Sequence, residues 1–564
     1  MNEPLGHNVA RHLRIAALEQ PEAWATKTPL SVGPNGSVSH ARCSFRQLDQ
    51  ESDAAARIFQ AEGIQQGCRV LLALRPGHDL IVGMFGLLKV GAVPIAIDPG
   101  MGWENFLACV DHAQPTALVG TRAAIWLSHL PLPAFKTLQC RVKLGTTRWR
   151  HLIKTCTATT PRPLANVLDT DLAAILFTSG STGKPKGVCY THGMFEAQIS
   201  LIQKTFGIQP GEIDMPMLPL FALFNPALRM TSVTPLLNPS RPASANPAPI
   251  VAALRAENVT NSFGSPAIWT LITEHCLQCG LTLPSLRRLL IAGAPVPDRL
   301  LEQLQKVAPH CQINTPYGAT ECLPVTNIEA QERLTETRSA SLQGHGTCVG
   351  RPVNGVTIRI IRITDTPLAQ MQDAQLCEVN EIGEIIVTGP NVTHAYDGLP
   401  EATAAAKIYD QGQVWHRMGD LGKIDGQGRL WFLGRKAEKV TTDMGVLYTE
   451  AIEPLFRTHP QVARCALIGV GSAPHQKPYL VIEPRPENFP LNDDETKLLQ
   501  ASLKQLSQTS AHTAMIQGFL LQKKLPVDVR HNAKIHRLKL SQFWTQNLQH
   551  QARWHWLKPR LDHD

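Results

Sequence analysis

The sequence has no block of like charges, no uninterrupted apolar run of membrane-spanning length, and no repeats or low-complexity tracts. Its 54 basic and 46 acidic residues leave a net charge of +8 that is spread over 564 residues. A mild, evenly distributed excess of this kind does not indicate nucleic-acid binding. It supports only a weak attraction for anionic substrates, for anionic cofactors or for a membrane surface.

The most apolar long window, residues 80–97, is interrupted by Lys89 and Pro94. It therefore favours a buried helix, a turn and a strand over a membrane span, which needs about 20 apolar residues. Residues 1–7 lack a basic stretch followed by an apolar core, so we expect no signal peptide.

Cysteines are present in an odd number, 13, and most of them stand alone. Cys276 and Cys279 form a C-x-x-C pair, but no second pair completes the four ligands of a structural zinc site. The histidines of residues 550–563 also lack regular metal-ligand spacing. We therefore expect reduced cysteines in a cytoplasmic protein.

Two stretches, residues 9–120 and 200–345, alternate between helical and strand patterns. The expected helices span residues 45–62, 80–89, 250–256, 266–276 and 298–307, and the expected strands span residues 69–74, 92–97, 262–263 and 289–292. The strand patterns are buried rather than alternating, as in a parallel sheet that helices cover on both faces. The chain is therefore predicted to be an α/β protein.

The pattern changes near Cys348 to short strands, at residues 356–363, 383–387 and 429–433, with residues 364–381 as an exposed insertion. After Gly434 the sequence predicts a hairpin at residues 439–447, strands at 465–470, 479–482 and 519–523, and a helix at 493–506. This last unit of about 130 residues has the size of a small α+β domain. We predict two domains, residues 1–434 and 435–564.

An apolar strand at residues 173–177 leads into a loop of hydroxyl-bearing residues and glycines. The loop consists of Thr178, Ser179, Gly180, Ser181, Thr182 and Gly183, and Lys184 and Lys186 follow it. Glycines let the backbone approach a ligand closely, consecutive N–H groups form an anion-binding nest, and hydroxyls and lysines add donors. The Walker A pattern G-x-x-x-x-G-K-[ST] is absent. We interpret the loop as a phosphate-binding loop, although by itself it also fits a solvated turn.

Residues 178–187 resemble the phosphate loop of the adenylate-forming enzymes, which include acyl-CoA synthetases, nonribosomal adenylation domains and luciferases. Other segments resemble that family's motifs in the same order, and together they cover about residues 9–545: an adenine-contacting turn at 292–295, a Y-G-x-T-E signature at 315–321, a G-D motif at 417–420, a hinge at 434–436 and a C-terminal lysine at Lys534. The resemblance implies a large N-terminal domain of parallel sheets with a distorted β-barrel-like part. A hinge would join it to a small C-terminal α+β domain.

The resemblance also implies ATP and Mg²⁺ as cofactors. Glu321 would bind Mg²⁺, which prefers hard oxygen ligands, and Thr320 would donate to the α-phosphate. Tyr317 would stack on adenine, and Asp420 would accept bonds from the ribose hydroxyls with the assistance of Arg435. The other implied nucleotide-binding residues are Thr178, Ser179, Gly180, Ser181, Thr182, Gly183, Lys186, Gly293, Ala294, Pro295 and Gly318.

Adenylate formation brings two anions together, so it requires cations and donors where negative charge develops. The resemblance implies that Lys534 bridges the substrate carboxylate and the α-phosphate. Lys436 would be the hinge residue about which the small domain rotates between two half-reactions, and closure would exclude water. Taken singly, each of these residues also fits a structural role. His192 is assigned no catalytic role.

The fate of the adenylate is indicated by two further patterns. Lys439 is followed by residues 440–442, Val-Thr-Thr, so threonine stands where CoA-using relatives have glycine, and CoA is not expected. Seven segments resemble the β-lactone synthetases of bacterial long-chain olefin biosynthesis: residues 221–228, 264–267, 292–297, 315–325, 416–420, 447–450 and 532–534. Those enzymes adenylate a 2-alkyl-3-hydroxy fatty acid, whose own hydroxyl then displaces AMP.

The resemblance thus implies a long-chain β-hydroxy acid as substrate, cyclised to a β-lactone with release of AMP and pyrophosphate. A tethered hydroxyl has a high effective concentration, which offsets ring strain. The apolar residues 218–228 fit an alkyl-chain pocket or ordinary core packing. A fatty-acyl-CoA or acyl-AMP ligase is the enzymatic alternative. The non-enzymatic alternative is a nucleotide-binding pseudoenzyme that serves as a scaffold. Peripheral membrane contact and assembly with pathway enzymes stay open.

Overall fold

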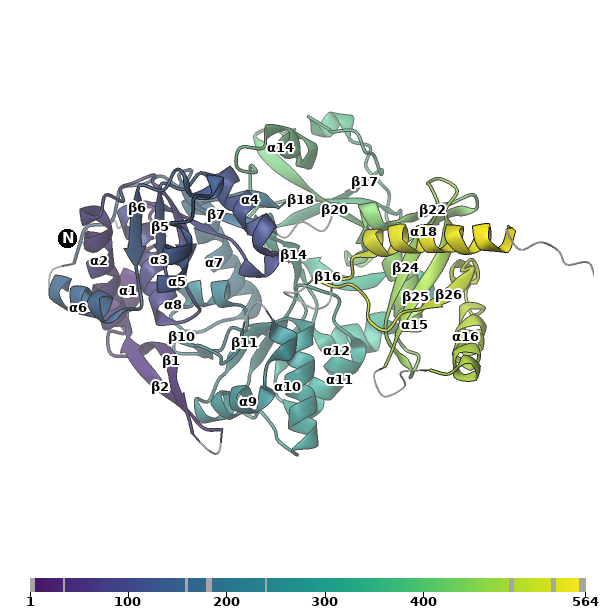
Figure 1. Cartoon of the computed structure of the whole chain (residues 1–564), viewed down its shortest axis with the longest axis horizontal. Coiled ribbons are helices and arrows are strands. Elements are labelled where there is room, and N and C mark those ends of the chain that lie inside the picture. The colour runs from purple at the N-terminus through teal and green to yellow at the C-terminus, as the bar shows by residue number, and fades with distance from the viewer. Residues whose placement is uncertain are drawn as a thin grey trace, which may run out of the picture.

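The computed structural model describes residues 6–33, 36–157, 161–178, 185–238, 241–485, 491–528 and 534–556. A larger part, coloured purple to green in Figure 1, carries three sheets with helices packed around them. A smaller part, coloured light green to yellow, follows at its side and ends in the long helix α18 (Arg537–Trp556). The predicted phosphate-loop residues 179–184 lie outside the described residues.

The first sheet has six strands in the order β6-β5-β3-β4-β7-β8, and all neighbours are parallel except β7 and β8. Its strands are β3 (Arg69–Ala73), β4 (Val93–Ala96), β5 (Ala117–Gly120), β6 (Cys140–Lys143), β7 (Leu172–Thr178) and β8 (Lys186–Thr191). The helices of this region are α1 (Arg11–Glu19), α2 (Phe45–Ala61), α3 (His78–Val90), α4 (Trp103–Ala113), α5 (Arg122–Leu127), α6 (Thr147–Cys156) and α7 (His192–Phe206). The expected helices and strands of this region are confirmed to within a few residues.

The second sheet has seven strands in the order β13-β12-β11-β9-β10-β1-β2, and only β2 runs antiparallel to its neighbour. The strands are β1 (Trp24–Val32), β2 (Val38–Ser44), β9 (Ile213–Asp214), β10 (Thr231–Val233), β11 (Asn261–Gly264), β12 (Arg288–Ile291) and β13 (Gln312–Asn314). Its helices are α8 (Asn225–Leu228), α9 (Pro247–Ala256), α10 (Pro266–Gln278) and α11 (Asp298–Val307). The predicted α/β class, with buried parallel strands, is confirmed.

The third sheet is antiparallel and corresponds to the expected barrel-like part. Its strands are β14 (Tyr317–Ala319), β15 (Cys322–Asn327), β16 (Thr347–Pro352), β17 (Thr357–Ile361), β18 (Gly383–Thr388), β19 (Lys407–Asp410), β20 (Gln413–Ile424) and β21 (Leu430–Arg435). The described strands form an open sheet with β14 and β17 at its two ends, not a closed barrel. A single antiparallel bridge joins Ile361, at the end of β17, to Leu376 in the segment 364–381. These residues are mostly exposed, as expected, but Leu368 is buried.

The smaller part has an apolar core of its own, which includes Phe456, Leu467, Ile482 and Leu503. The predicted hairpin, three strands and helix are confirmed. The elements are β22 (Val440–Thr442), β23 (Gly445–Leu447), α15 (Thr449–Phe456), β24 (Val462–Val470), β25 (Lys477–Pro484), α16 (Asp493–Ser507), α17 (Ala511–Ala514) and β26 (Gly518–Leu521). Helix α16 begins with a capping box in which Asn492 and Glu495 bond to each other's backbone N–H.

Residues 80–97 form most of α3 and all of β4, as their interrupted apolar pattern predicts. Among the described helices, none combines the length and apolar character that crossing a bilayer requires. Each of the 13 cysteines is a free thiol.

Candidate active site

A cavity of about 2900 Å³ lies where the three sheets and the smaller part meet. Residues that follow β4 and β12, including Asp98 and Gly293, line it. The carboxyl ends of parallel strands are where open α/β sheets bind ligands. The predicted site residues that line this cavity are Lys186, Gly293, Ala294, Pro295, Tyr317, Gly318, Thr320, Glu321, Asp420, Arg435, Lys436 and Lys534. Motifs that are far apart in the sequence therefore surround one space.

Three of these residues form a connected group around a buried carboxylate. Tyr317 donates from its Oη to Oδ2 of Asp420 at 2.5 Å, and Arg435 NH1 lies 2.8 Å from Oδ1. Burial raises the pKa of the Asp420 carboxyl, while the charges of Arg435 and Lys534 and the bond from Tyr317 oppose that rise. The carboxylate of Asp420 in turn raises the pKa of Arg435. The group holds one fixed carboxylate at the wall of the cavity.

Glu321 is oriented by a tyrosine that the sequence patterns did not reveal. Tyr396 donates from its Oη to Oε1 of Glu321 at 2.8 Å, and Lys186 Nζ lies 4.8 Å from the centroid of the Tyr396 ring. The backbone beside Glu321 is held as well, because Tyr190 Oη donates to the carbonyl of Thr320. An oriented carboxylate at a cavity wall fits Mg²⁺, which prefers hard oxygen ligands and keeps much of its coordination for water and phosphate.

A buried lysine behind Glu321 was also missed from the sequence. Lys407 is 1% exposed, and its Nζ donates to the carbonyl and Oγ1 of Thr393, whose own N–H bonds to the carbonyl of Glu321. Burial lowers the pKa of Lys407 to about 8, against the opposing charge of Glu321. No local motif marks this residue, because its partner Thr393 and the nearby Glu321 are distant from it in the sequence.

His416 lies opposite Lys407 in the β19–β20 register and lines the cavity. Its side chain is buried, and its Nδ1 has no hydrogen-bond partner among the described residues. Burial, together with the charge of Lys407, lowers the pKa of His416 well below its usual value. The imidazole is therefore neutral near pH 7.

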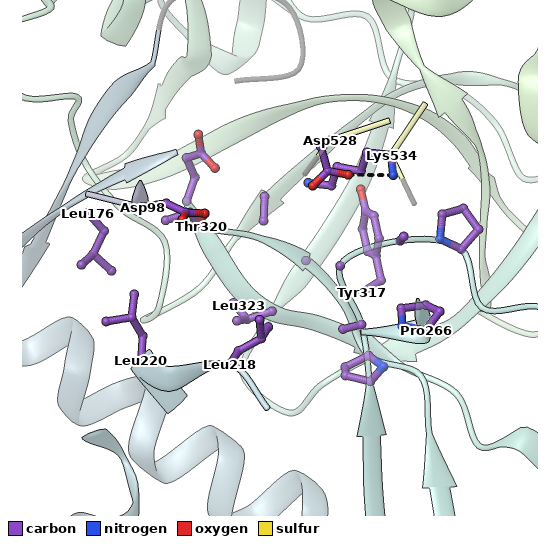
Figure 2. Close-up of a pocket in the computed structure, with 18 of the residues that line it drawn as sticks. Asp98, Leu176, Leu218, Leu220, Pro266, Tyr317, Thr320, Leu323, Asp528 and Lys534 are labelled. Carbon is purple, nitrogen blue, oxygen red and sulfur yellow. Dashed lines mark hydrogen bonds between the residues drawn. The ribbon is translucent and has the colours of Figure 1, made fainter. Parts of the chain in front are cut away.

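The C-terminal lysine lines the cavity, and its backbone is held by Asp528. The N–H of Lys534 donates to Oδ1 of Asp528 at 2.9 Å, and the N–H of Asp528 donates back to the carbonyl of Lys534 at 2.9 Å. Figure 2 shows both residues close to the ring of Tyr317. The smaller part therefore contributes its lysine to the same space as Asp420.

The predicted hinge residue is tied to the larger part. Lys436 donates from its Nζ to the carbonyl of Thr364 at 2.5 Å and to Oε2 of Glu384 at 3.2 Å. Its Nζ also lies 3.1 Å from Oδ1 of Asp365. Residues 364–365, at the start of the exposed insertion, thus contact the link between the two parts.

One wall of the cavity is apolar. Figure 2 shows Leu218, Leu220 and Leu323 together on the side away from Lys534. Further lining residues on this side are Met84, Phe85, Ile199, Ile202, Phe221, Leu223, Phe224 and Ala227. The aromatic side chains are held in place by ring contacts, such as that of Phe221 with Phe263 at 3.8 Å between centroids. Many residues of the predicted alkyl-pocket stretch 218–228 therefore line the cavity.

Thr178 and His192 are not among the described residues that line the cavity. Thr178 is the last residue of β7 and pairs with Lys186, whereas Ser179, Gly180, Ser181, Thr182 and Gly183 lie outside the described residues. His192 is buried, and its Nδ1 accepts a bond from the N–H of Val9 at 3.2 Å. Burial lowers the pKa of His192 to about 4, so this histidine is a neutral structural residue.

Solved structures define the class of this fold. ATP-bound MatB from Rhodopseudomonas palustris superposes with a TM-score of 0.77 at 19% identity and covers 96% of this chain and 99% of its own. O-succinylbenzoate coenzyme A synthetase from Bacillus subtilis, in complex with AMP, gives a TM-score of 0.73 at 20% identity, with 94% and 97% covered. The fold is that of the adenylate-forming enzymes, as the ordered motifs predicted.

The sequence then specifies the family. The model of the family described as "AMP-binding enzyme" matches residues 13–397, and the chain belongs to this family. An olefin beta-lactone synthetase of Stenotrophomonas maltophilia strain K279a is 42% identical over 565 residues, which cover 98% of this chain and 100% of the relative. The olefin beta-lactone synthetase of Xanthomonas campestris pv. campestris is 41% identical, with 95% and 97% covered.

Proposed function

We propose that this AMP-forming ligase activates a long-chain 2-alkyl-3-hydroxy acid as its acyl-adenylate and closes it to a β-lactone. The observation that carries the proposal is one cavity with two kinds of wall: a charged wall at Glu321, Asp420 and Lys534, and an apolar wall at residues 218–228. Similarity over the full chain to two olefin beta-lactone synthetases supports the same reaction.

The charged wall is proposed to bind ATP. Asp420, fixed by Tyr317 and Arg435, would accept bonds from the ribose hydroxyls, and residues 293–295 and Tyr317 would contact adenine. Glu321 would hold Mg²⁺, with Tyr396 orienting its carboxylate. When bound, Mg²⁺ neutralises phosphate charge. Lys186 and residues 178–183 would contact the phosphates.

In the first half-reaction a carboxylate oxygen of the acid attacks the α-phosphorus, and the bond to pyrophosphate breaks. Thr320 and Lys534 would stabilise the negative charge that develops on the α-phosphate. Lys534 lies on the same side of the cavity as Asp420, which supports its placement beside the α-phosphate.

In the second half-reaction the substrate's own 3-hydroxyl oxygen attacks the acyl carbonyl carbon. The bond from that carbon to the AMP oxygen breaks, the hydroxyl proton passes to solvent, and AMP leaves with the electron pair. Tethering makes the nucleophile effectively concentrated, so no external thiol is needed. Thr442 in β22, where CoA-using relatives carry glycine, supports a reaction without CoA.

The apolar wall is proposed to hold the alkyl part of the acid. Side chains from α3, α7, α8 and the turn at Pro219–Leu223 contribute to it, and most are only partly buried because they face the cavity. Burying alkyl carbons there contributes about 0.8 kcal/mol for each CH₂ group. A long chain therefore binds more tightly than a short one.

The two-domain division, residues 1–434 and 435–564, belongs to this proposal. The boundary after Gly434 lies one residue before the end of β21 at Arg435. Lys436 would be the hinge residue. The separate apolar core of the smaller part supports its movement as a unit. We place the enzyme in the cytoplasm.

The proposal is tested by incubating the purified protein with ATP, Mg²⁺ and a racemic 2-alkyl-3-hydroxy fatty acid in the absence of CoA. NMR of the products should show β-lactone together with AMP. Pyrophosphate exchange without lactone would leave an adenylating enzyme and would overturn the cyclisation step. Addition of CoA to that mixture would then test for an acyl-CoA product. With neither exchange nor lactone, the acid is not a substrate.

A further inference from the structure

Arg537 is the hub of a buried charge cluster in the smaller part. Its Nε and NH2 donate to Oε1 and Oε2 of Glu453, both at 2.8 Å, and its NH1 donates to Oε2 of Glu438 at 3.0 Å. The Arg537 side chain is 12% exposed, and those of Glu453 and Glu438 are 0% and 7% exposed. Multidentate, charge-assisted bonds of this kind fix geometry as well as adding stability.

Arg537 lies three residues after Lys534, and the chain between them is held throughout. Ile535 pairs with Val527 in an antiparallel bridge, and the N–H of His536 donates to the carbonyl of Pro526 at 2.8 Å. The N–H of Arg537 bonds to the carbonyl of Ile535 at 3.0 Å. Backbone contacts therefore hold the segment of about 10 Å that joins Arg537 to Lys534.

Glu438 connects the same arginine to the link between the two parts. It follows Lys436 by two residues in the short turn Lys436–Glu438, and Lys436 is bonded to Thr364 and Glu384 of the larger part. A continuous set of contacts thus runs from the larger part through Lys436 and Glu438 to Arg537 and on to Lys534.

The other glutamates of the cluster have partners that do not involve Glu438. Arg457 already donates to Oε2 of Glu453 at 2.6 Å, and the N–H of Leu467 donates to Oε1 at 3.0 Å. Arg457 also pairs with Glu450 at 2.8 Å. The core of the cluster is complete without Glu438, so the third bond of Arg537 serves the connection to the hinge.

We propose that Arg537, bonded to Glu438, is the positioning residue that places Lys534 at the charged wall when the hinge is in the observed arrangement. The inference rests on the proposed function, in which Lys534 acts in adenylate formation and the smaller part moves between half-reactions. Although Arg537 also lines the cavity, its guanidinium is bonded to Glu453 and Glu438, so its proposed role is an indirect one. It acts through the segment that carries Lys534.

The test compares Glu438→Leu and Glu438→Gln with the matched control Glu450→Gln. Glu450 belongs to the same cluster, accepts bonds from Arg457 and Thr347, and makes no hydrogen bond to Arg537. We expect Glu438→Leu to lower kcat for ATP–pyrophosphate exchange about tenfold, with KM for ATP within about twofold. Glu438→Gln should lie between Glu438→Leu and the wild type, and Glu450→Gln should keep the wild-type kcat.

Two further readouts separate positioning from folding and from chemistry. Conversion of a chemically prepared acyl-adenylate to lactone should be unchanged in Glu438→Leu, because that step does not use Lys534 in the observed arrangement. Hydrogen–deuterium exchange at residues 534–537 should be faster in Glu438→Leu and unchanged in Glu450→Gln. Hydrogen–deuterium exchange does not depend on the reaction. It therefore tests the positioning role even if the proposed acid is not a substrate. Unchanged kcat and unchanged hydrogen exchange in Glu438→Leu would overturn the inference, as would an equal loss of both half-reactions.

Discussion

Tyr317 and Asp420, which are 103 residues apart, share a hydrogen bond of 2.5 Å from the phenol Oη to the carboxylate Oδ2. They lie on β14 and β20, at different positions in the same sheet. The residue expected to contact adenine therefore orients the residue expected to hold the ribose. This bond directly connects the two halves of the proposed nucleoside site.

Replacing Tyr317 by phenylalanine keeps the ring and removes this bond. We expect KM for ATP to rise about tenfold, because a buried carboxylate oxygen loses its donor at a cost of about 1–1.5 kcal/mol. The bond from Tyr317 lowers the pKa of Asp420, so its loss should move the acid limb of the kcat/KM profile for ATP to higher pH. Tyr409→Phe, at a side chain that is 45% exposed, is the control. An unchanged pH profile would contradict this role.

Replacing Lys534 by alanine should abolish adenylate formation and leave ATP binding intact. The reason is that the side-chain cation is proposed to act on charge that develops in the transition state, which is a loss in kcat rather than in ground-state affinity. Pyrophosphate exchange measures adenylate formation, and calorimetry measures the affinity for ATP. Lys497→Ala, at a 77% exposed lysine of α16, should behave as the wild type. Pyrophosphate exchange at the wild-type rate in Lys534→Ala would exclude a role of Lys534 in adenylate formation.

Replacing Tyr396 by phenylalanine should weaken the proposed binding of Mg²⁺ by Glu321. Loss of a partner that orients a metal ligand typically costs 10- to 100-fold in metal affinity, so the Mg²⁺ concentration that gives half-maximal exchange should rise about tenfold. Binding of Mn²⁺ to the ATP complex, followed by electron paramagnetic resonance, gives a readout apart from activity. Wild-type metal affinity in this variant would show that Glu321 does not need Tyr396.

Lys407 should make stability increase with pH above neutrality. Its pKa is lowered to about 8 in the folded protein from 10.5, so between these values the unfolded chain binds more protons than the folded one. Stability therefore rises with pH from about 8 to 10.5, by a total on the order of 3 kcal/mol. Melting temperatures are measured from pH 7 to 10. The melting temperature of the wild type should rise relative to that of Lys407→Met as the pH increases. Parallel curves would rule out the lowered pKa.

Local patterns in the sequence predicted most elements because those patterns reflect short-range geometry. The helix expected at residues 298–307 has these bounds in α11, since Leu300, Leu301, Leu304 and Val307 form one buried face. Strand ends were less predictable. Strand β24 begins at Val462 rather than at residue 465, because Val462 pairs with Pro484 of β25. The partner strand, not the local sequence, determines where the pairing ends.

The sequence by itself determined the α/β class and the order of the motifs, because both follow from patterns along the chain. Its resemblance to the adenylate-forming enzymes implied the roles of Thr320, Glu321, Asp420, Arg435 and Lys534. The tertiary structure alone decided which residues surround them. Tyr396 and Lys407 approach Glu321 from distant segments, and Arg537 meets Glu438 across 99 residues. Such partners depend on how strands pair and how distant segments pack within each part, and neither leaves a local signal in the sequence.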